Sequence, residues 1–319
     1  MNVCFDLRKV DYFPFEQPVV TVGTFDGVHR GHQRIIKKLV GKAKRKKKKS
    51  VLVTFEPHPQ SVVAPKSAPK ILTTLEEKLF LLEKLGIDET LVLNFDKELS
   101  CYSAEEFIQK ILIDKLNIGD LVIGYDHAFG RNREGRKELL RKASQKYGFG
   151  LETVLPVKND DLPIKSTRIR KELLNGDFTK AIHMLGHSYP IYGAKIPGSG
   201  LGKKMGYPTM NLAVSEKKLL PQDGVYTSLV QIENSLYSGM FYSGKSFIFP
   251  NKGRSLEVNV FDYRPKNDVK KVGLFLLDRI RSNEKFENID ALKEQLRDDE
   301  RKAKMFLSRK GGILAFSKT

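Results

Sequence analysis

The chain contains no tryptophan and only two cysteines among its 319 residues. Cys4 and Cys101 lie far apart and form no Cys-x-x-Cys spacing. A pair placed in this way argues against a disulfide framework and against a zinc site, and it favours reduced thiols in a cytoplasmic protein. The absence of tryptophan removes one type of interface residue and excludes no class of function.

Long apolar runs are missing as well. No stretch approaches the roughly 18 uninterrupted apolar residues that a membrane-spanning helix needs. Charges and prolines interrupt the apolar positions of the first 20 residues, so this segment does not resemble a secretory signal peptide. We expect no membrane partner. The hydrophobic fraction of 40% is ordinary for a globular protein, and 319 residues suffice for about two domains.

Acidic residues are scarce relative to basic ones. The sequence has 38 Asp and Glu against 56 Lys and Arg, which gives a net charge of +18. Such a charge attracts polyanions: nucleic acid, anionic lipid or phosphorylated small molecules. The run GKAKRKKKKS at 41–50 is either a nucleic-acid patch or the solvated end of a helix with its loop. It contains no aromatic residue, which favours the second interpretation, so we expect no nucleic-acid partner.

The first part of the chain alternates strand and helix patterns. Short β-branched apolar runs predict strands at 19–22, 51–55, 91–95, 120–124 and 151–157. Helical periodicity predicts helices at 72–86, 103–117 and 133–148, and Ser103 with Glu106 forms a capping-box pattern. This alternation is typical of an α/β fold with an open parallel sheet that is covered on both faces.

The pattern changes near residue 187. Two short helices are predicted at 166–176 and 177–186, and Gly- and Pro-rich loops follow. Alternating runs at 188–196, 224–232, 255–263 and 270–280 predict a small antiparallel β-barrel, and a last helix is predicted at 288–307. We therefore expect two domains, at 1–186 and 187–319.

The segment GTFDGVHRGH at 23–32 combines glycines with two histidines after a predicted strand. The carboxyl end of a strand is where open α/β sheets bind ligands. A helix that begins near Gly31 points its free N–H groups at the same place and makes an anion site. His29 and His32, three apart, could both reach a bound phosphate. They are otherwise surface histidines at a helix cap, or a zinc pair that lacks a third ligand nearby in the sequence.

The string TVGTFDGVHRGH resembles the phosphate-binding motif of the HxGH nucleotidyltransferases, specifically the N-terminal module of bacterial bifunctional FAD synthetases. Three further motifs follow in that family's order: TFEPHPQ at 54–60, GYDHAFGRNREG at 124–135 and KSTRIR at 165–170. The resemblance implies a Rossmann-like nucleotidyltransferase domain that transfers AMP from ATP to FMN and releases pyrophosphate.

The resemblance also implies roles for particular residues. His29 and His32 would hold the ATP phosphates, while Ser166, Thr167 and Arg168 would close over the departing pyrophosphate. Asp126 and Arg131 suit phosphate contacts but could be loop charges without a ligand, and His58 could touch the flavin or rigidify a turn. The remaining residues expected around ATP and its phosphates are Gly23, Phe25, Asp26, Gly31 and Gly124.

A second motif, GAKIPGSGLGKKMGYPTMNL at 193–212, resembles the riboflavin kinase signature. Its glycines suit a loop that wraps phosphates, although a flexible linker has the same composition. Thr209 and Asn211 are two apart, so on a strand they share one face and offer oxygen ligands suited to Mg²⁺. Glu257 matches the family's catalytic base and is otherwise an exposed strand glutamate. The phosphate-loop glycines are Gly198, Gly200, Gly202 and Gly206.

Together the motifs imply a Mg²⁺-dependent transferase that phosphorylates riboflavin to FMN and then adenylylates FMN to FAD, with ATP in each step. Its partners would be these small molecules, and the sequence does not indicate an oligomeric state. The segments 240–253 and 264–273 depart from the family pattern. An FMN adenylyltransferase with a weak kinase-like barrel is therefore an alternative, and a basic nucleic-acid-binding protein is an alternative of another class.

Overall fold

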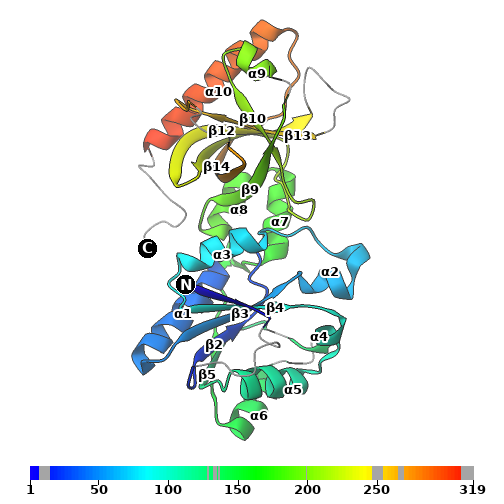
Figure 1. Cartoon of the computed structure of the whole chain (residues 1–319), viewed down its shortest axis with the longest axis vertical. Helices are drawn as coiled ribbons and strands as arrows, with labels where there is room; N and C mark the ends of the chain where they lie inside the picture. The colour runs from blue at the N-terminus through cyan, green and yellow to red at the C-terminus, as the bar shows by residue number, and fades with distance from the viewer. Residues whose placement is uncertain are drawn as a thin grey trace. The chain divides into compact units, whose positions relative to one another are not determined.

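The structure is a computed structural model, and it describes residues 1–6, 15–127, 129–131, 135, 137–198, 200–245, 254–264 and 269–309. The chain divides into two compact units (Figure 1). The first comprises Met1–Ile71 and Lys78–Lys165, and the second comprises Leu72–Glu77 and Ser166–Thr319. No helix in the described ranges is long and apolar enough to cross a membrane.

The first unit contains a six-stranded sheet in the order β1-β4-β3-β2-β5-β6. Every neighbouring pair is parallel. The chain passes from β2 through β3 to β4 on one side and then returns to pair β5 with β2 on the other, so the topology switches between β2 and β5, where open α/β sheets bind ligands. The strands are β1 Asn2–Phe5, β2 Val19–Val22, β3 Ser50–Glu56, β4 Glu89–Asn94, β5 Asp120–Gly124 and β6 Gly150–Val154.

Helices cover both faces of this sheet, as the alternation of buried strand residues requires. Val19 and Val122 pack with Leu39 of α1 on one face. Val20 and Val53 belong to the core on the other face, which also holds residues of α5, η3 and α6. The helical elements of this unit are α1 Arg30–Lys46, α2 Pro59–Val63, the 3₁₀ turn η2 Pro65–Ser67, α4 Lys97–Cys101, α5 Ala104–Phe107, the π-helical η3 Ile108–Lys115 and α6 Lys137–Tyr147.

The basic run is the end of α1 and the loop after it, as its second interpretation predicts. α1 ends at Lys46, and β3 begins at Ser50. Lys42 and Lys46 form ion pairs with the buried Asp120 at 3.0 and 2.6 Å. Lys42 also pairs with Glu152 at 3.1 Å. Part of the run therefore pairs with acidic side chains of β5 and β6, and basic residues in the last helical turn also complement the helix dipole.

The second unit contains a closed antiparallel barrel in the order β10-β13-β12-β11-β14-β9. The predicted barrel is confirmed, and its strands follow the alternating runs. β10 and β12 are additional strands, and Gly239 within β12 would meet the carbonyl of Asn259 if it carried a Cβ. The strands are β9 Tyr189–Ile196, β10 Thr209–Ala213, β11 Gly224–Ile232, β12 Ser235–Lys245, β13 Arg254–Val260 and β14 Lys271–Ser282.

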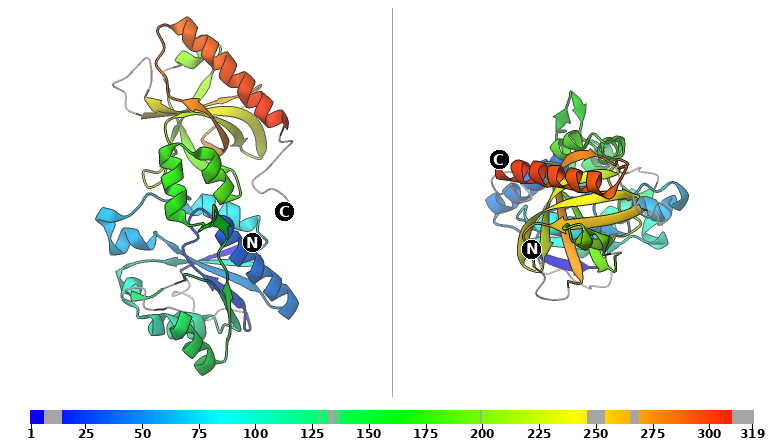
Figure 2. Two further views of the ribbon diagram at one scale, coloured as in Figure 1. Left: turned by 180° about the vertical axis from the view of Figure 1, so that it is seen from behind. Right: turned by 90° about the horizontal axis from the view of Figure 1, so that it is seen from above.

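Helices pack on the outside of this barrel, and α10 Ile289–Arg309 lies along it (Figure 2). The buried Asp299 of α10 accepts hydrogen bonds from the guanidinium of Arg281 on β14 at 2.8–3.0 Å. Ala303 of the same helix joins a core with Val225 and Phe261. The ion pair and the apolar contacts together fix the helix against the barrel. The other helices are α7 Ser166–Asn175, α8 Phe178–Leu185 and α9 Leu201–Lys204.

The structural division differs from the expected boundary at His187. Residues 166–186 group with the second unit, because α8 contacts β14 and Phe178 packs edge-on against Tyr226 at 5.0 Å. α3 Leu75–Glu83 contributes residues to both units. A short hairpin, β7 Lys158–Asn159 with β8 Leu162–Pro163, follows β6, which ends at Val154 and not at 157.

Candidate functional site

The loop between β2 and α1 holds an unusual backbone. Phe25 and Val28 have φ angles of 48° and 38°, and Gly27 has 82°. Positive φ values at non-glycine residues are strained and collect at functional sites. Phe25 is nevertheless almost fully buried, and its ring would contact a Cβ at Gly23 at 3.2 Å. Gly23 is therefore glycine because the Phe25 ring packs against it, and this packing shapes the loop before the histidines.

His29 and His32 stack on each other at the start of α1. Their ring centroids are 3.6 Å apart, and the rings are nearly parallel at 18°. His29 is the N-cap, and its Nδ1 accepts a hydrogen bond from the backbone N–H of His32 at 3.4 Å. A Cβ at Gly31 would come within 3.1 Å of the His29 ring, so glycine lets that ring take its position. The structure thus brings the two predicted histidines together at a helix N-terminus.

The side chain of His32 is prepared for a partner that the protein does not supply. Its Nδ1 is buried without a hydrogen bond within the described part of the chain. Burial, followed by the charges of His29 and Lys78, holds the pKa of His32 well below its usual range. The ring is therefore neutral near pH 7 and can donate one hydrogen bond to a phosphate oxygen.

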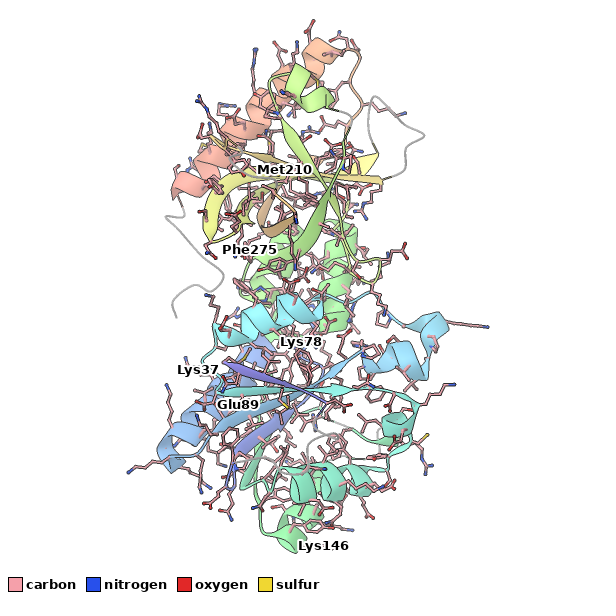
Figure 3. All side chains as sticks on the ribbon, viewed as in Figure 1. Lys37, Lys78, Glu89, Lys146, Met210 and Phe275 are labelled. Carbon is pink, nitrogen blue, oxygen red and sulfur yellow. The ribbon has the colours of Figure 1, made fainter. Side chains whose placement is uncertain are left out.

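Lys78, which the sequence patterns did not single out, belongs to the same surroundings. Its Nζ donates a hydrogen bond to Thr54 Oγ1 at 3.1 Å, and Thr54 Oγ1 donates to the Thr24 carbonyl at 3.2 Å. Lys78 is 5% exposed and comes from α3 (Figure 3). One signal was available in the sequence: Lys78 lies three and four residues before Leu81 and Leu82, on the buried face of the helix.

The end of β5 carries a second part of the predicted site. Asp126 forms an ion pair with Lys165 at 3.2 Å, and both side chains are half exposed. A Cβ at Gly124 would meet Ile35 of α1 at 3.1 Å. Arg131 is exposed, and its backbone N–H bonds to the Tyr102 carbonyl at 2.9 Å. Within the described residues, no hydrogen bond or ion pair joins the Arg131 side chain to the histidines. Arg133 of the same motif lies outside the described residues.

His58 has a local structural role. It is the N-cap of α2, and its Nδ1 accepts a hydrogen bond from the Gln60 backbone N–H at 3.2 Å. Its carbonyl also accepts hydrogen bonds from Ser61. Of the two alternatives for His58, a flavin contact or a rigid turn, these contacts fit the rigid turn.

The motif KSTRIR straddles the division between the units. Lys165 belongs to the first unit, and the carbonyl of the preceding Ile164 would lie 3.7 Å from a Cβ at Gly31. Ser166 begins α7 in the second unit, Thr167 is exposed, and Arg168 is half-buried. The motif therefore contains a helix N-terminus with hydroxyl and guanidinium groups, which is an arrangement suited to a phosphate.

The second predicted cluster forms inside the barrel unit. Thr209 Oγ1 donates a hydrogen bond to the Glu257 carboxylate at 2.9 Å, and Ser255 Oγ donates to its other oxygen at 3.0 Å. Asn211 of β10 lies opposite Glu257 of β13 in the strand register. Asn259, 7% exposed, donates to the Pro208 carbonyl at 2.8 Å and so holds the start of β10. Sequence reasoning missed both contributions. The contact of Asn259 depends on this strand pairing, whereas Ser255 lies two residues before Glu257 on the same strand, a spacing that the sequence did offer.

The predicted glycine loop meets the same cluster. A Cβ at Gly198 would lie 2.2 Å from the Asn211 amide nitrogen, and one at Gly202 would lie 2.3 Å from the Tyr207 carbonyl. The Gly202 position therefore excludes any larger residue, whereas a larger residue at position 198 would displace the Asn211 side chain. Gly200 and Gly206 have φ angles of 72° and 85°, which favour glycine. Among the departures from the family pattern, residues 246–253 and 265–268 lie outside the described residues.

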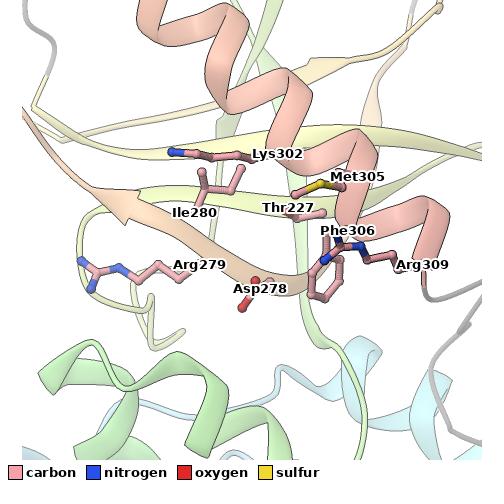
Figure 4. Close-up of a pocket in the computed structure, with 8 residues that line it drawn as sticks. All are labelled: Thr227, Asp278, Arg279, Ile280, Lys302, Met305, Phe306 and Arg309. Atoms are coloured by element: carbon pink, nitrogen blue, oxygen red, sulfur yellow. The ribbon is translucent and has the colours of Figure 1, made fainter.

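The barrel unit also has a pocket of about 440 Å³ between α10 and the strands β11 and β14 (Figure 4). None of the predicted site residues in the described ranges lines it. Its charge comes from Arg279, Lys302 and Arg309, with Asp278 as the acidic member. The pocket is thus distinct from the cluster around Glu257.

Comparisons with known proteins find a matching family for each of the two parts of the chain. A family model described as FAD synthetase matches residues 14–168, and one described as riboflavin kinase matches residues 185–307. A bifunctional riboflavin kinase/FMN adenylyltransferase of Buchnera aphidicola subsp. Schizaphis graminum (strain Sg) is 35% identical over 298 residues, which cover 92% of this chain and 94% of the relative. The protein of the same description from Escherichia coli (strain K12) is 31% identical over 307 residues, which cover 96% and 98%.

A solved structure extends the likeness. A crystal structure from Streptococcus pneumoniae, described as a macrolide-efflux protein, is similar with a TM-score of 0.83. It is 28% identical, and the match covers 95% of this chain and 99% of that one. The fold is thus shared over almost the entire chain.

Proposed function

We propose, since this chain belongs to the family of bifunctional riboflavin kinase/FMN adenylyltransferases, that the His29–His32 pair serves adenylyl transfer and that the Thr209–Glu257 pair serves riboflavin phosphorylation. The enzyme is a transferase that converts riboflavin to FMN and FMN to FAD, with ATP, riboflavin and FMN as substrates. The observation that carries the residue assignment is the stacking of His29 on His32 at the N-terminus of α1.

In adenylyl transfer, a phosphate oxygen of FMN attacks the α-phosphorus of ATP, and the bond to the pyrophosphate oxygen breaks. No proton has to be transferred, so catalysis rests on positioning and charge stabilisation. Because Nδ1 of His29 accepts the His32 N–H, neutral His29 carries its proton on Nε2, where it can donate to a phosphate. Ser166, Thr167 and Arg168, at the start of α7, are proposed to bind the leaving pyrophosphate.

Further first-unit residues have supporting roles in this proposal. Gly23, Phe25 and Asp26 shape the nucleotide loop, and Gly31 makes room for the His29 ring. Gly124 and Asp126, at the end of β5, are proposed to border the nucleotide site. Arg131 is proposed as a contact to the nucleotide or the flavin phosphate that depends on the bound ligand.

In riboflavin phosphorylation, the ribityl hydroxyl attacks the γ-phosphorus of ATP, its proton passes to Glu257, and ADP leaves. The two hydroxyl donors from Thr209 and Ser255 fix the orientation of this carboxylate. Gly198, Gly200, Gly202 and Gly206 are proposed to let the backbone wrap the ATP phosphates. A side chain at position 202 would meet the Tyr207 carbonyl, one at 198 would meet the Asn211 side chain, and the other two glycines have positive φ.

A magnesium ion fits the donors of this cluster. The hydroxyl of Thr209 donates a hydrogen bond to Glu257, which leaves the lone pairs of Oγ1 available to a cation. Asn211 offers an amide oxygen from the same strand, and hard oxygen donors beside substrate phosphates suit Mg²⁺. When bound, the ion would neutralise charge on the ATP phosphates. We propose Thr209 and Asn211 as the residues that hold it.

The functional modules are proposed to be residues 1–186 and 187–319. The gap between the two family matches, from 169 to 184, supports a boundary there, although α7 and α8 pack with the barrel unit. A cytoplasmic location is proposed from the cysteine content alone.

The direct test is incubation with riboflavin, ATP and Mg²⁺, followed by separation of FMN and FAD over time. FMN should form first and FAD should follow. FAD formation from supplied FMN should depend on His29 but not on Glu257, whereas FMN formation should show the reverse. Equal loss of both products in either variant would contradict the assignment of separate clusters.

A further inference from the structure

The reactions as assigned so far leave one buried charge of the first unit unused. The side chain of Lys78 is 5% exposed. Within the described ranges, its ammonium makes a single hydrogen bond, to Thr54 Oγ1. An ammonium carries three donors, so two of them have no protein acceptor. Lysine is almost never buried in this way unless it is paired.

Among the residues that the structure describes, no carboxylate completes the pairing. Asp26 and Glu56 attract Lys78 electrostatically, but neither forms an ion pair with it. A buried charge without a partner is costly, because its desolvation is not offset. Burial accordingly lowers the pKa of Lys78, against the effect of the two carboxylates. A bound anion would supply the opposite charge and offset this cost.

The surroundings of Lys78 connect it to the histidine pair. Its acceptor Thr54 is itself bonded to Thr24, within the loop that leads to His29. Its charge also contributes to the low pKa of His32, whose Nδ1 is a second buried group without a partner. Two independent features, an under-satisfied ammonium and an unpaired imidazole nitrogen, therefore occur around one loop.

We propose that Lys78 is a further catalytic residue of adenylyl transfer, whose ammonium binds the polyphosphate of ATP and then the pyrophosphate that leaves. This inference rests on the proposed role of the histidine pair. As the bond between the α-phosphorus and the bridging oxygen breaks, the electron pair stays on that oxygen, and the new negative charge falls on pyrophosphate. A compact point charge such as an ammonium stabilises it without a proton transfer. The phosphate of FMN is the competing ligand of the same chemistry.

The test compares Lys78→Met with Lys37→Met in the full-length chain. Methionine keeps the length of the side chain and removes its charge, and Lys37 is exposed on α1, so both variants change the net charge equally. For Lys78→Met, we expect kcat/KM for ATP in FAD formation from FMN to fall about 100-fold or more, as removal of one transition-state donor does. Lys37→Met should stay within about twofold, and riboflavin phosphorylation should be unchanged in both variants.

Pyrophosphate binding, measured by calorimetry without turnover, separates the possible ligands. We expect Lys78→Met to weaken pyrophosphate binding at least about tenfold and to leave the KM for FMN within about twofold. A loss of FMN affinity with intact pyrophosphate binding would overturn the proposal in favour of the flavin phosphate. Calorimetry measures binding without catalysis, so the two proposals can fail separately. A wild-type chain that made no FAD would contradict the proposed function, and the pyrophosphate affinities would still test the role of Lys78.

A binding role and a purely structural role for Lys78 make opposite predictions about stability. If Lys78 binds an anion, replacing its buried ammonium by an apolar chain of similar volume should leave the thermal unfolding temperature unchanged or raise it. Lys78→Arg, which keeps the charge, should retain more FAD synthesis than Lys78→Met. If Lys78→Met unfolds at a lower temperature and Lys78→Arg is equally inactive, Lys78 only supports the fold and the proposal is wrong.

Discussion

Thr209 on β10 and Glu257 on β13 are joined by a hydrogen bond of 2.9 Å, with the hydroxyl as donor. The bond exists because these strands are paired, with Asn211 opposite Glu257 in the register. It orients the carboxylate and uses the hydroxyl hydrogen of Thr209. One contact therefore joins the two side chains that we propose as the base and as a cation ligand.

Glu257→Gln is expected to lower riboflavin phosphorylation by about 10²–10⁴-fold, because an amide cannot accept the ribityl proton. FAD formation from supplied FMN should stay within about twofold, since that reaction needs no base. Both rates are measured by separating FMN and FAD over time. Glu216→Gln, at an exposed position, is the matched control. Near-normal phosphorylation in Glu257→Gln would remove Glu257 from the reaction.

Thr209→Val removes the hydroxyl and keeps the shape of the side chain. We expect riboflavin phosphorylation to need at least about tenfold more Mg²⁺ for half-maximal rate, because one oxygen ligand and the carboxylate's donor are lost together. Thr209→Ser should restore most of the wild-type dependence. The measurement is a Mg²⁺ titration of the phosphorylation rate, and an unchanged titration curve in Thr209→Val would argue against a metal ligand at this position.

His29→Ala and His32→Ala are each expected to lower FAD formation by about 10²–10³-fold, while riboflavin phosphorylation continues. The two rings stack at 3.6 Å, so the loss of either also disturbs the other. Their effects should therefore be non-additive, and the double variant should be little worse than the single ones. Rates of FAD formation in all three variants decide this. Independent, additive losses would mean that the histidines do not act as one unit.

The sequence predicted residues of both clusters, but not all of the residues that the structure brings together there. His29, His32 and Glu257 stand in short motifs, where spacing along one helix or strand already fixes their neighbours. Lys78 stands in no such motif, and it reaches Thr54 from another element. Ser255 was missed although it lies two residues before Glu257 on the same strand. Contacts between distant segments are set by tertiary packing, which periodicity does not report.

The fold shows the same limit. The parallel strands and the barrel follow from alternation and apolar runs, yet β1, the short hairpin β7–β8, β10 and β12 were missed. β1 is short, and β12 contains Ser, Gly and Tyr in place of β-branched residues. The grouping of α7 and α8 with the barrel depends on contacts such as Phe178 with Tyr226, which lie 48 positions apart in the sequence.

The low pKa of His32 predicts how stability depends on pH. A histidine with a lower pKa in the folded chain than in the unfolded chain binds fewer protons when folded. The free energy of unfolding must then fall as the pH drops below about 6.5, by up to about 1.4 kcal/mol per pH unit from this group. His32→Asn should show a shallower loss between about pH 6.5 and 5.5, measured by urea unfolding. Equal slopes in the two proteins would contradict the assigned shift.

A buried ion pair in the second unit allows a test of stability that is independent of catalysis. Lys218 Nζ donates to Glu77 Oε2 and to the Pro190 carbonyl, both at 2.7 Å, and both charged side chains are fully buried. Lys218→Met leaves the Glu77 carboxylate without its counter-charge, which is expected to cost about 3–5 kcal/mol.

The loss should appear as a lower temperature at which riboflavin phosphorylation disappears on heating. Lys217→Met, at the exposed neighbouring position, should leave this temperature unchanged. The double variant Lys218→Met with Glu77→Gln should recover part of the loss, since it removes the unpaired charge. Glu77 accepts a hydrogen bond from the Tyr192 backbone N–H at 2.9 Å, and the glutamine must accept the same bond. If the double variant were as unstable as Lys218→Met, the packing of the lysine stem, and not its charge, would hold residues 72–77 to the barrel.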